Sequence, residues 1–279
     1  MSSKRLDALV SDDGFPAALA SVTTRDGRVR NYTAGVGDPK THSAVPVDGQ
    51  VRIGGNTKVF TAVTVLQLVG EGRIGLDEPV ETYLPGLIRG DGIDGRNITV
   101  RQILQHTSGL PDYTNTFTKG LLPYRHTYFP KPGDETIREP HPHGYHHDDP
   151  KAPLTDVTVE DPSQGWAAGQ MISTPSDVNR FFSALIGGRL LPTAQLKEMR
   201  TTVPAPALGN GVRYGLGLTG TPLSCGGVAW GHGGDFPGYH TSDAVTQDGR
   251  AATIAVTELP SSPTQLQHLT AGIDTALCR

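Results

Sequence analysis

The sequence predicts an α/β fold with an antiparallel sheet that is built from both ends of the chain and flanked by helices. The middle of the chain is predicted to form a reduced, largely irregular or helical subdomain. Strand-like segments lie near the N-terminus and again from about residue 211 to 260, with helical patterns between them. Residues 113–165 have little periodicity and many Pro, His and Asp residues. The 35 glycines and 22 prolines are typical of a chain with many turns and long connections.

The N-terminal part predicts a hairpin and one buried helix. The segment FPAALASVTTRDGRVRNYTAGVGD indicates two strands joined at Asp26-Gly27, a dipeptide typical of hairpin turns. A short strand from Val51 to Ile53 leads into a helix from about Asn56 to Val69. That helix is apolar nearly all round, so we expect it to be buried, and we expect Gly70 to end it.

The rest of the chain alternates short helices with strand-like pieces. The segment ITVRQILQHTSGL predicts a brief helix that Gly109 ends. Two further helices are expected, one with Thr174 as N-cap before Pro175 and one with Thr193 as N-cap. Strands are expected in GVRYGLGLTG, GGVAWGHGG, TSDAVTQDG and RAATIAVTEL, and a last helix from about Pro263 to Leu277.

Charge and hydropathy exclude several classes of partner. The net charge of -4 and the absence of a Lys/Arg stripe argue against nucleic acid. No apolar run is long enough to span a membrane. The start, MSSKRLDALVSDDG, has no apolar stretch behind its basic residues, so we expect no secretory signal and a cytoplasmic protein. The two cysteines, Cys225 and Cys278, cannot be assigned as a disulfide from their spacing.

The start of the buried helix places a lysine at a chemically useful position. In Gly55-Asn56-Thr57-Lys58, residues 55 and 58 lie one turn apart on one helical face. A serine at the first position could attack an acyl carbonyl if a buried lysine with a lowered pKa accepted its proton. Gly55 has no hydroxyl. The structural alternative is a snorkelling lysine at a helix end, although a cation in the first turn opposes the helix dipole.

A second candidate segment is WGHGGDFPGYH. The two glycines after His232 let a substrate backbone approach the strand closely, and the imidazole can donate a hydrogen bond to an anionic or carbonyl group. The alternative is a strand that ends in a glycine-rich turn without function.

Four segments occur in the order found in one enzyme family. They are RIGGNTKVFTAVTVLQLVGEGRIGLDEPVETYLPGL, ITVRQILQHTSGLPDYTN, GWAAGQMISTPSDVNRFFSALIGGRLL and YGLGL followed by CGGVAWGHGG. The chain therefore resembles the serine β-lactamase-like family, in particular its class C and D-alanyl-D-alanine carboxypeptidase branch with related esterases and transacylases. The resemblance covers most of the chain except the middle. It implies a discontinuous α/β domain of residues 1–75 plus 165–279 and a reduced helical or loop subdomain of residues 76–164.

The resemblance also implies roles for single residues. Gly55 occupies the nucleophile position and Lys58 the base position. His232-Gly233-Gly234 resembles the family's Lys-Thr-Gly triad, and the backbone N–H groups of residue 55 and Asp235 would form the oxyanion hole. Cys225 and Cys278 match a pair that is joined in some secreted relatives, so we expect them to lie close together. Substrate contacts are expected from Asn56, Gly233, Gly234, Tyr113, Tyr145 and Trp166.

The chain departs from the family pattern in three ways. No acyl-enzyme can form at Gly55. The family's Tyr-x-Asn motif is missing from its helical segment; Tyr113-Thr114-Asn115 has the right letters but directly follows HTSGLPD, and Tyr124 and Tyr145 remain alternatives. The segment GLGLTGTPLS has no basic residue to hold a terminal carboxylate, which favours an ester or a neutral amide as substrate.

Two other patterns suggest ligands. GLGLTG, from Gly215, spells GxGxxG, but the following TPLSCGG cannot open a helix, so we do not expect a nucleotide. HPHGYHHDDP offers zinc ligands in a spacing that matches no helical metal motif, so we expect a solvated or substrate-facing loop, with no metal and no cofactor. We interpret His106, in LQHTSGL, as a structural histidine at a helix end. The possible ligands in the loop are His141, His143, His146, His147, Asp148 and Asp149.

The sequence leaves two main functions and one minor alternative. The first is a serine-type acyl-enzyme hydrolase or acyltransferase acting on a small ester or amide, in which Gly55 replaces an original serine. Gly54-Gly55 adds backbone freedom at a helix start without evident structural return, which favours such a replacement. The second is a natural non-catalytic member that binds an acyl or peptide ligand. The third is metal-dependent hydrolysis through residues 141–149. A reduced middle would expose apolar surface that a partner subunit could cover, so oligomers are compatible with the sequence.

Overall fold

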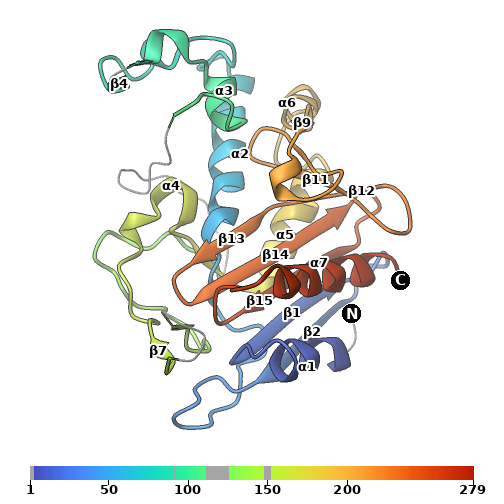
Figure 1. Ribbon diagram of the computed structural model, residues 1–279. Helices are drawn as coiled ribbons and strands as arrows, with labels where there is room; N and C mark the ends of the chain where they lie inside the picture. Colours follow the sequence, from blue (N-terminus) through green and yellow to red (C-terminus); the bar gives the residue numbers. More distant parts are fainter. Residues whose placement is uncertain (1–2, 91, 111–125, 148–151) are drawn as a thin grey trace.

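Both ends of the chain contribute to one antiparallel sheet (Figure 1). The computed structural model describes residues 3–90, 92–110, 126–147 and 152–279. Within these residues, nine strands form the sheet in the order β2-β1-β15-β14-β12-β11-β10-β9, and β13 also pairs with β14. The strands are β1 (Ala17–Thr23), β2 (Val29–Gly35), β9 (Val203–Pro204), β10 (Arg213–Tyr214), β11 (Thr219–Pro222), β12 (Val228–Gly231), β13 (Gly233–Phe236), β14 (Tyr239–Thr246) and β15 (Ala251–Val256).

The pairing of β1 with β15 joins the two ends of the chain. Ala18 lies opposite Val256 in this antiparallel pair, and the hairpin partner of β1 is β2. The predicted hairpin around Asp26-Gly27 and the predicted sheet built from both termini are therefore confirmed. Shorter pairs lie outside this sheet: β3 (Val51–Arg52) with β8 (Ile172–Ser173), β4 (Arg89–Gly90) with β5 (Ile93–Asp94), and β6 (Tyr145–His146) with β7 (Thr155–Asp156).

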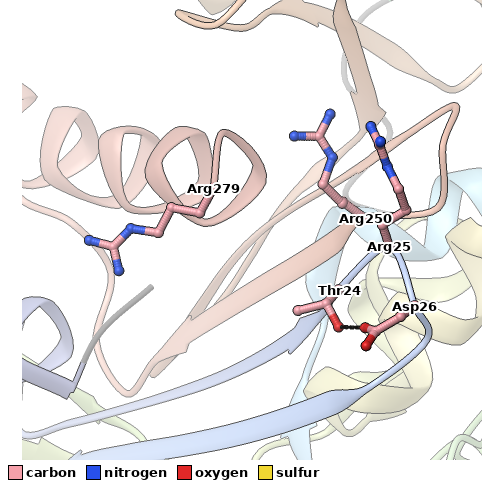
Figure 2. Close-up of a pocket in the computed structure, with 5 residues that line it drawn as sticks. All are labelled: Thr24, Arg25, Asp26, Arg250 and Arg279. Atoms are coloured by element: carbon pink, nitrogen blue, oxygen red, sulfur yellow. Dashed lines mark hydrogen bonds between the residues drawn. The ribbon is translucent and has the colours of Figure 1, made fainter.

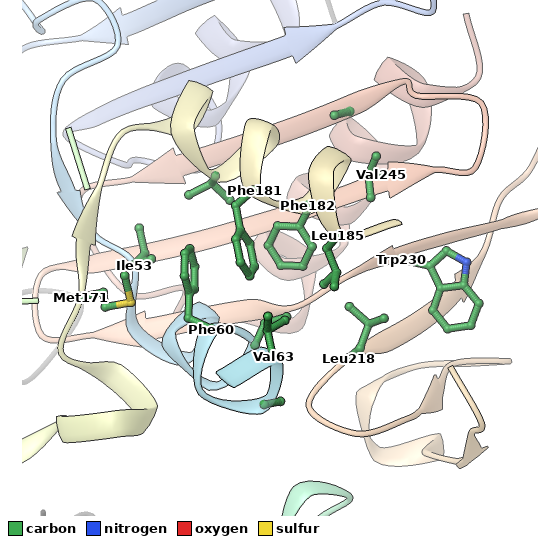
Figure 3. Close-up of a cluster of buried hydrophobic side chains, with 14 of the residues drawn as sticks. Ile53, Phe60, Val63, Met171, Phe181, Phe182, Leu185, Leu218, Trp230 and Val245 are labelled. Carbon is green, nitrogen blue, oxygen red and sulfur yellow. The ribbon is translucent and has the colours of Figure 1, made fainter. Parts of the chain in front are cut away.

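Helices cover both faces of the sheet. On one face, Leu6 and Leu269, from the first and last helices, pack on strand residues such as Ile254. On the other face, Phe60 stacks on Phe181 with ring centroids 3.6 Å apart (Figure 3). The helices are α1 (Ser3–Ser11), α2 (Thr57–Gly70), α3 (Val100–Leu104), α4 (Trp166–Gly169), α5 (Pro175–Ile186), α6 (Thr193–Met199) and α7 (Pro263–Leu277). Short 3-10 helices are η1 (Gly54–Asn56), η2 (Val80–Thr82), η3 (Gly95–Asn97), η4 (Pro162–Gln164) and η5 (Pro206–Leu208).

Helix α2 is the central helix that the sequence predicts. It follows η1 directly, and its buried side chains include Val59, Phe60, Val63 and Leu66. Gly70 is its last residue, close to the predicted stop. The predicted burial holds for one side of the helix only, because Val65, Leu68 and Val69 are half-buried and Thr64 is exposed.

Two predicted helix boundaries are wrong. Helix α3 ends at Leu104 rather than at Gly109, because His106 has a left-handed backbone with φ of 56°. Helix α6 has Pro192 rather than Thr193 at its N-cap, and no side chain accepts a hydrogen bond there. For α5 the prediction is confirmed: Thr174 accepts a hydrogen bond from the backbone N–H of Asp177.

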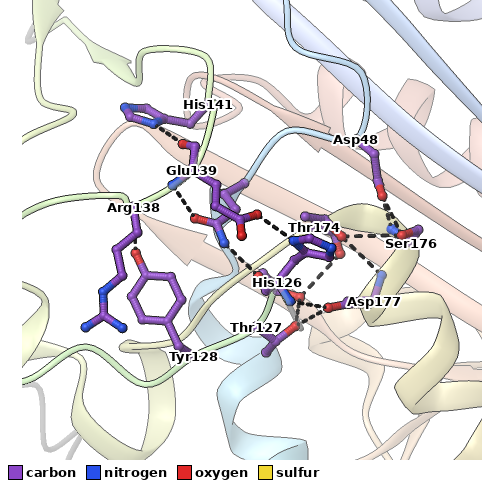
Figure 4. A network of polar contacts seen from close by, with 12 residues as sticks. Asp48, His126, Thr127, Tyr128, Arg138, Glu139, His141, Thr174, Ser176 and Asp177 are labelled. Carbon is purple, nitrogen blue, oxygen red and sulfur yellow. Dashed lines mark hydrogen bonds and ion pairs between the residues drawn. The ribbon is translucent and has the colours of Figure 1, made fainter. Parts of the chain in front are cut away.

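The irregular middle is tied to the sheet-covering helix α5 by polar contacts (Figure 4). The Asp177 carboxylate accepts hydrogen bonds from the Thr127 hydroxyl at 3.0 Å and from the His126 backbone at 3.1 Å. Asp48 accepts from the Ser176 backbone at 2.9 Å. The bond to Asp48 satisfies a free N–H group in the first turn of α5, and the bonds to Asp177 hold residues 126 and 127 against the same turn.

A disulfide joins two distant segments. Cys225, in the β11–β12 connection, bonds to Cys278 at the end of α7, with Cα atoms 5.6 Å apart. The expectation that these cysteines lie close together is confirmed. Among the described residues, no helix is both long and apolar enough to cross a bilayer.

Candidate active site

The start of α2 packs against strand β13 with almost no space between the two backbones. Gly54 has a φ of +46°, and a Cβ on it would lie 2.4 Å from the carbonyl oxygen of Asp235. A Cβ on Gly234 would lie 2.0 Å from the carbonyl oxygen of Ile53 and 2.9 Å from the backbone nitrogen of Gly55. Glycine is therefore required at position 54, because only glycine allows the two backbones to approach so closely. This corrects the sequence interpretation, which found no structural benefit in the Gly54-Gly55 pair.

Three predicted residues meet at this contact. A Cβ placed on Gly55 would lie 3.4 Å from Lys58 Nζ and 3.3 Å from Cε1 of His232. The Lys58 ammonium is half-buried and donates to the carbonyl oxygen of Ala168, in α4, at 3.2 Å. The structure therefore brings the backbone of Gly55, the tip of Lys58 and the imidazole of His232 to one point.

The His232 imidazole is held at both nitrogens. Nδ1 lies 2.5 Å from the carbonyl oxygen of Gly233, and Nε2 lies 3.0 Å from the Tyr214 hydroxyl. A proton on Nδ1 satisfies the first contact and leaves Nε2 to accept from the phenol. Burial lowers the pKa of His232 to about 4, and the positive charge of Lys58 acts in the same direction. The ring is therefore neutral at pH 7.

Tyr214 is a site residue that the sequence interpretation missed. Its side chain is 7% exposed, and its ring meets the edge of the His106 ring at 5.3 Å. Burial raises the pKa of its hydroxyl. Tyr214 begins the segment YGLGL, which lies far in sequence from the irregular middle, where the Tyr-x-Asn motif is expected.

Asp235 places a carboxylate beside the same site. Its side chain is 71% exposed, and Oδ1 lies 2.6 Å from Nδ1 of His240, its cross-strand partner. The hydrogen bond from His240 lowers the pKa of Asp235, and the positive charge of Lys58 adds to this effect. The carboxylate is therefore ionised at neutral pH.

Three residues that the sequence interpretation assigns to substrate binding have buried side chains. Asn56 is fully buried and donates from Nδ2 to the Thr241 hydroxyl at 2.9 Å. Trp166 is 8% exposed at the start of α4. Tyr145 is 2% exposed and donates to Asp38 at 3.1 Å. The predicted candidates Tyr113 and Tyr124 lie outside the described residues.

Gly233 differs from Gly234, although both were expected to face the substrate. A Cβ on Gly233 would have only the carbonyl oxygen of Thr241 nearby, at 3.7 Å, and the residue is exposed. Gly233 is thus on the open side of the strand, whereas Gly234 faces η1.

The other predicted ligand patterns lie in ordinary structure. The GxGxxG segment forms the connection between β10 and β11 and opens no helix. His143 pairs with Asp156 at 2.7 Å and His147 with Glu258 at 2.5 Å. Within the described part of the chain, no group of three or more His, Cys, Asp and Glu side chains is placed to hold a metal ion. Asp148 and Asp149 lie outside the described residues.

A pocket of about 510 Å³ lies elsewhere, at the β1–β2 and β14–β15 turns (Figure 2). None of the residues around Gly55 lines it, and in Figure 2 Arg25 and Arg250 lie side by side while Arg279 points away from them. It is therefore separate from the cluster around Gly55. Its lining residues are Thr24, Arg25, Asp26, Arg250 and Arg279.

Comparison with known proteins gives one family. The family profile described as beta-lactamase matches residues 3–122 and 118–276. Penicillin-binding protein 4 of Amycolatopsis lactamdurans is 37% identical over 112 residues, which is 40% of this chain and 29% of that protein. The matched part thus spans less than a third of that curated relative.

Solved structures match over nearly the whole chain. A D-stereospecific amidohydrolase from Streptomyces sp. is 32% identical, with a TM-score of 0.81 over 97% of this chain and 98% of that one. A D-amino acid amidase from Ochrobactrum anthropi SV3, complexed with L-phenylalanine amide, has a TM-score of 0.81 at 22% identity, over 99% and 96% of the two chains. An octameric penicillin-binding protein homologue from Pyrococcus abyssi has a TM-score of 0.77 at 18% identity, over 98% and 77%.

Proposed function

Because the chain belongs to the beta-lactamase family, we propose that the cluster around Gly55 is the acyl-transfer site of a serine-type hydrolase or acyltransferase whose nucleophile position holds glycine. One observation carries this proposal: a Cβ on residue 55 would lie 3.4 Å from Lys58 Nζ. A serine hydroxyl attached to that Cβ would be within hydrogen-bonding reach of the amine.

The proposed cycle needs a serine at position 55. Lys58, as a neutral amine, accepts the hydroxyl proton while the oxygen attacks the acyl carbonyl. The negative charge on the carbonyl oxygen is stabilised by the backbone N–H groups of residue 55 and Asp235. The leaving group departs with the proton from Lys58, and water or an amine then releases the acyl group. With Gly55 in place, the first bond cannot form.

His232 has an orienting role in this proposal. Both of its ring nitrogens contact protein groups, Gly233 and Tyr214, and its pKa of about 4 makes it a poor proton acceptor at neutral pH. The neutral ring instead forms a wall of the site beside residue 55. Tyr214 fixes that wall because its hydroxyl donates to Nε2.

The charges around the site favour a neutral or cationic substrate. Asp235 is exposed and ionised, and it lies on the strand that would border the acyl group. A free ammonium group next to the scissile bond would be attracted to this carboxylate. Amides or esters of amino acids carry such a group. The 32% identical Streptomyces relative, an amidohydrolase, supports an amide substrate.

The central experiment restores a hydroxyl. We expect Gly55→Ser to release about one equivalent of alcohol from an activated amino acid ester in a burst, and intact mass spectrometry to show the acyl adduct. Gly55→Ser combined with Lys58→Met is the matched control and should show no burst. A Gly55→Ser protein that folds yet gives neither burst nor adduct would remove the catalytic proposal.

One contact at Gly55 favours the second function, a non-catalytic binding protein. A Cβ on residue 55 would lie only 2.7 Å from the carbonyl oxygen of Gly233, so β13 must move by a few tenths of an ångström to admit any side chain. Thermal unfolding of Gly55→Ala measures this strain without adding a hydroxyl. The codon at position 55 in the native gene separates the two functions, because a serine codon would exclude a natural binding protein.

Binding by the unaltered chain tests the site and its charge together. By calorimetry, we expect phenylalanine amide to bind at least about tenfold more tightly than its N-acetyl form, and Asp235→Asn to abolish this difference. Equal binding of the two forms would contradict the role of Asp235 but leave the site intact. Failure to bind either form would count against the binding function as well.

A further inference from the structure

Asp243 lies in β14, in the layer behind the candidate site. Its side chain is buried, and neither carboxyl oxygen has a hydrogen-bond partner among the described residues. Burying an ionised carboxylate without donors is strongly unfavourable, because burial removes the water that stabilises its charge. The acyl-transfer proposal gives this group no role.

The strand register places Asp243 beside His232. Trp230 pairs with Val245, and Gly233 pairs with Ser242, so β12 and β13 continue one register along β14. His232, between the two strands, therefore lies opposite Asp243, and cross-strand partners point to the same face of a sheet. The polar groups next to the carboxyl are the backbone N–H of His232 and the amide of Asn56.

The Asn56 amide also contacts β14. Its Nδ2 donates to the Thr241 hydroxyl at 2.9 Å, and residues 241 and 243 project from the same face of β14. The other polar atom of the amide, Oδ1 of Asn56, is also buried and has no hydrogen-bond donor. The buried oxygens without a hydrogen-bond partner in this layer thus include Oδ1 of Asn56 and both carboxyl oxygens of Asp243.

We propose that Asp243 holds a proton at neutral pH, so that the layer behind Lys58 and His232 carries no negative charge. A neutral carboxyl group avoids the cost of a buried unpaired charge, and it lies next to the His232 backbone N–H. Burial raises the pKa of Asp243 well above its ordinary value, in agreement with the geometry.

Among the described residues, the elements packed around Asp243 supply no counter-charge for an ionised form. On β15, its cross-strand partner is Thr253, whose hydroxyl bonds Asn179 of α5 at 2.8 Å. The charged or titratable neighbours on the other elements have contacts of their own. Lys58 donates to Ala168, Arg52 of β3 donates to backbone carbonyls, and His232 contacts Gly233 and Tyr214.

The proton has a consequence for the site, which rests on the proposed function. An ionised Asp243 would stabilise the charged forms of Lys58 and His232 and raise the pKa of both groups. Lys58 would then be less available as a neutral base. Asp243 is a positioning residue in this scheme, since it acts through Lys58 and His232 rather than on the substrate.

Infrared spectroscopy of the unaltered chain tests the proton directly and does not depend on catalysis. We expect the carbonyl stretch of a protonated carboxylic acid at pH 7, shifted in D₂O and lost in Asp243→Asn. Asp248→Asn is the control, because its hydrogen bonds, chiefly from Thr246, hold the pKa of that carboxyl far below its usual range. Glu258, whose pKa is raised by burial, is checked with Glu258→Gln. An acid band unchanged by Asp243→Asn overturns the proposal.

Thermal unfolding against pH gives a second test. A folded-state pKa above the unfolded value means that unfolding releases the proton above pH ~4, so stability falls as pH rises. Asp243→Asn removes this loss, and its Tm advantage over the parent should grow from pH 4 to pH 8. A constant difference overturns the proposal. If the variant does not fold, carbon NMR of the parent decides, because one Asp carboxyl must fail to titrate between pH 4 and 7.

Discussion

The two adjacent glycines at the start of α2 differ in what they allow. Gly54 has a left-handed φ and faces the Asp235 backbone, whereas Gly55 has an ordinary backbone and faces side chains as well as one carbonyl. The sequence GG does not show this difference. It depends on β13, more than 170 residues further along the chain.

A substitution at Gly54 should therefore be strongly destabilising. We expect Gly54→Ala to lower the free energy of unfolding by about 2 kcal/mol or more, because it combines an unfavourable φ with backbone overlap. Gly233→Ala is the control, since its Cβ would meet only an ordinary contact at 3.7 Å. Urea unfolding measures both. Equal effects of the two variants would show that the approach of Gly54 to Asp235 is looser than described.

His232 should make the protein sensitive to acid. Its folded-state pKa of about 4 lies below the unfolded value of 6.5, so its contribution to stability is fully present above pH 6.5 and is lost as pH falls towards 4. We expect His232→Gln to flatten this part of the profile of Tm against pH. A profile that keeps the same slope in the variant would assign the acid loss to other groups.

At the level of single residues, sequence reasoning found the groups that a local motif contains. Lys58 and His232 follow from short segments, and the structure brings both to Gly55. Tyr214 and Asp243 could not be found in this way, because their importance depends on which strands are neighbours. A buried aspartate inside the strand segment TSDAVTQDG looks like a surface residue until the register is known.

The element that attaches the irregular middle to the site is β3. Arg52 is fully buried, and its guanidinium donates to the carbonyl oxygens of Glu135 at 2.8 Å, Thr158 at 3.1 Å and Glu160 at 2.9 Å. The same guanidinium lies over the Phe236 ring, 5.0 Å from its centroid. One side chain beside the site therefore organises two segments that lack regular structure.

Replacing this guanidinium should loosen the middle. We expect Arg52→Lys to lower the free energy of unfolding by about 2–4 kcal/mol, because the buried, strongly hydrated ammonium cannot reproduce the planar guanidinium that lies over the Phe236 ring while it reaches the carbonyls. Limited proteolysis should then cut between residues 126 and 165 faster than in the parent. Arg138→Lys, at a half-exposed ion pair with Asp134, is the control and should change stability little.

Elements with strong local signals were predicted well, and elements fixed by tertiary contacts were not. The hairpin, α2, α5 and α7 follow from turn residues, caps and apolar patterns. The middle has few such signals, and its short strands and helices depend on bonds from Arg52 and Asp177. Propensity is too weak to place segments held mainly by long-range hydrogen bonds.

The disulfide acts at the level of the whole molecule, because it connects the β11–β12 loop to the last helix across 53 positions. In the chain-entropy description, a loop of this size contributes about 4 kcal/mol. We expect reductant to lower the Tm of the parent and to leave the Tm of the Cys225→Ala/Cys278→Ala protein unchanged. Equal melting of the reduced and oxidised parent would contradict this role.

The pairing of β1 with β15 has a consequence for biosynthesis. The hairpin β1–β2 emerges from the ribosome early, yet its other neighbour in the sheet is made some 230 residues later. Until β15 is made, the edge of β1 that will pair with it stays unpaired. Residue 55 likewise lacks its contact with β13 during this time. Contacts between such remote segments form slowly, and an uncovered edge invites association with other chains. Nascent copies should therefore benefit from holding chaperones more than their length alone would suggest.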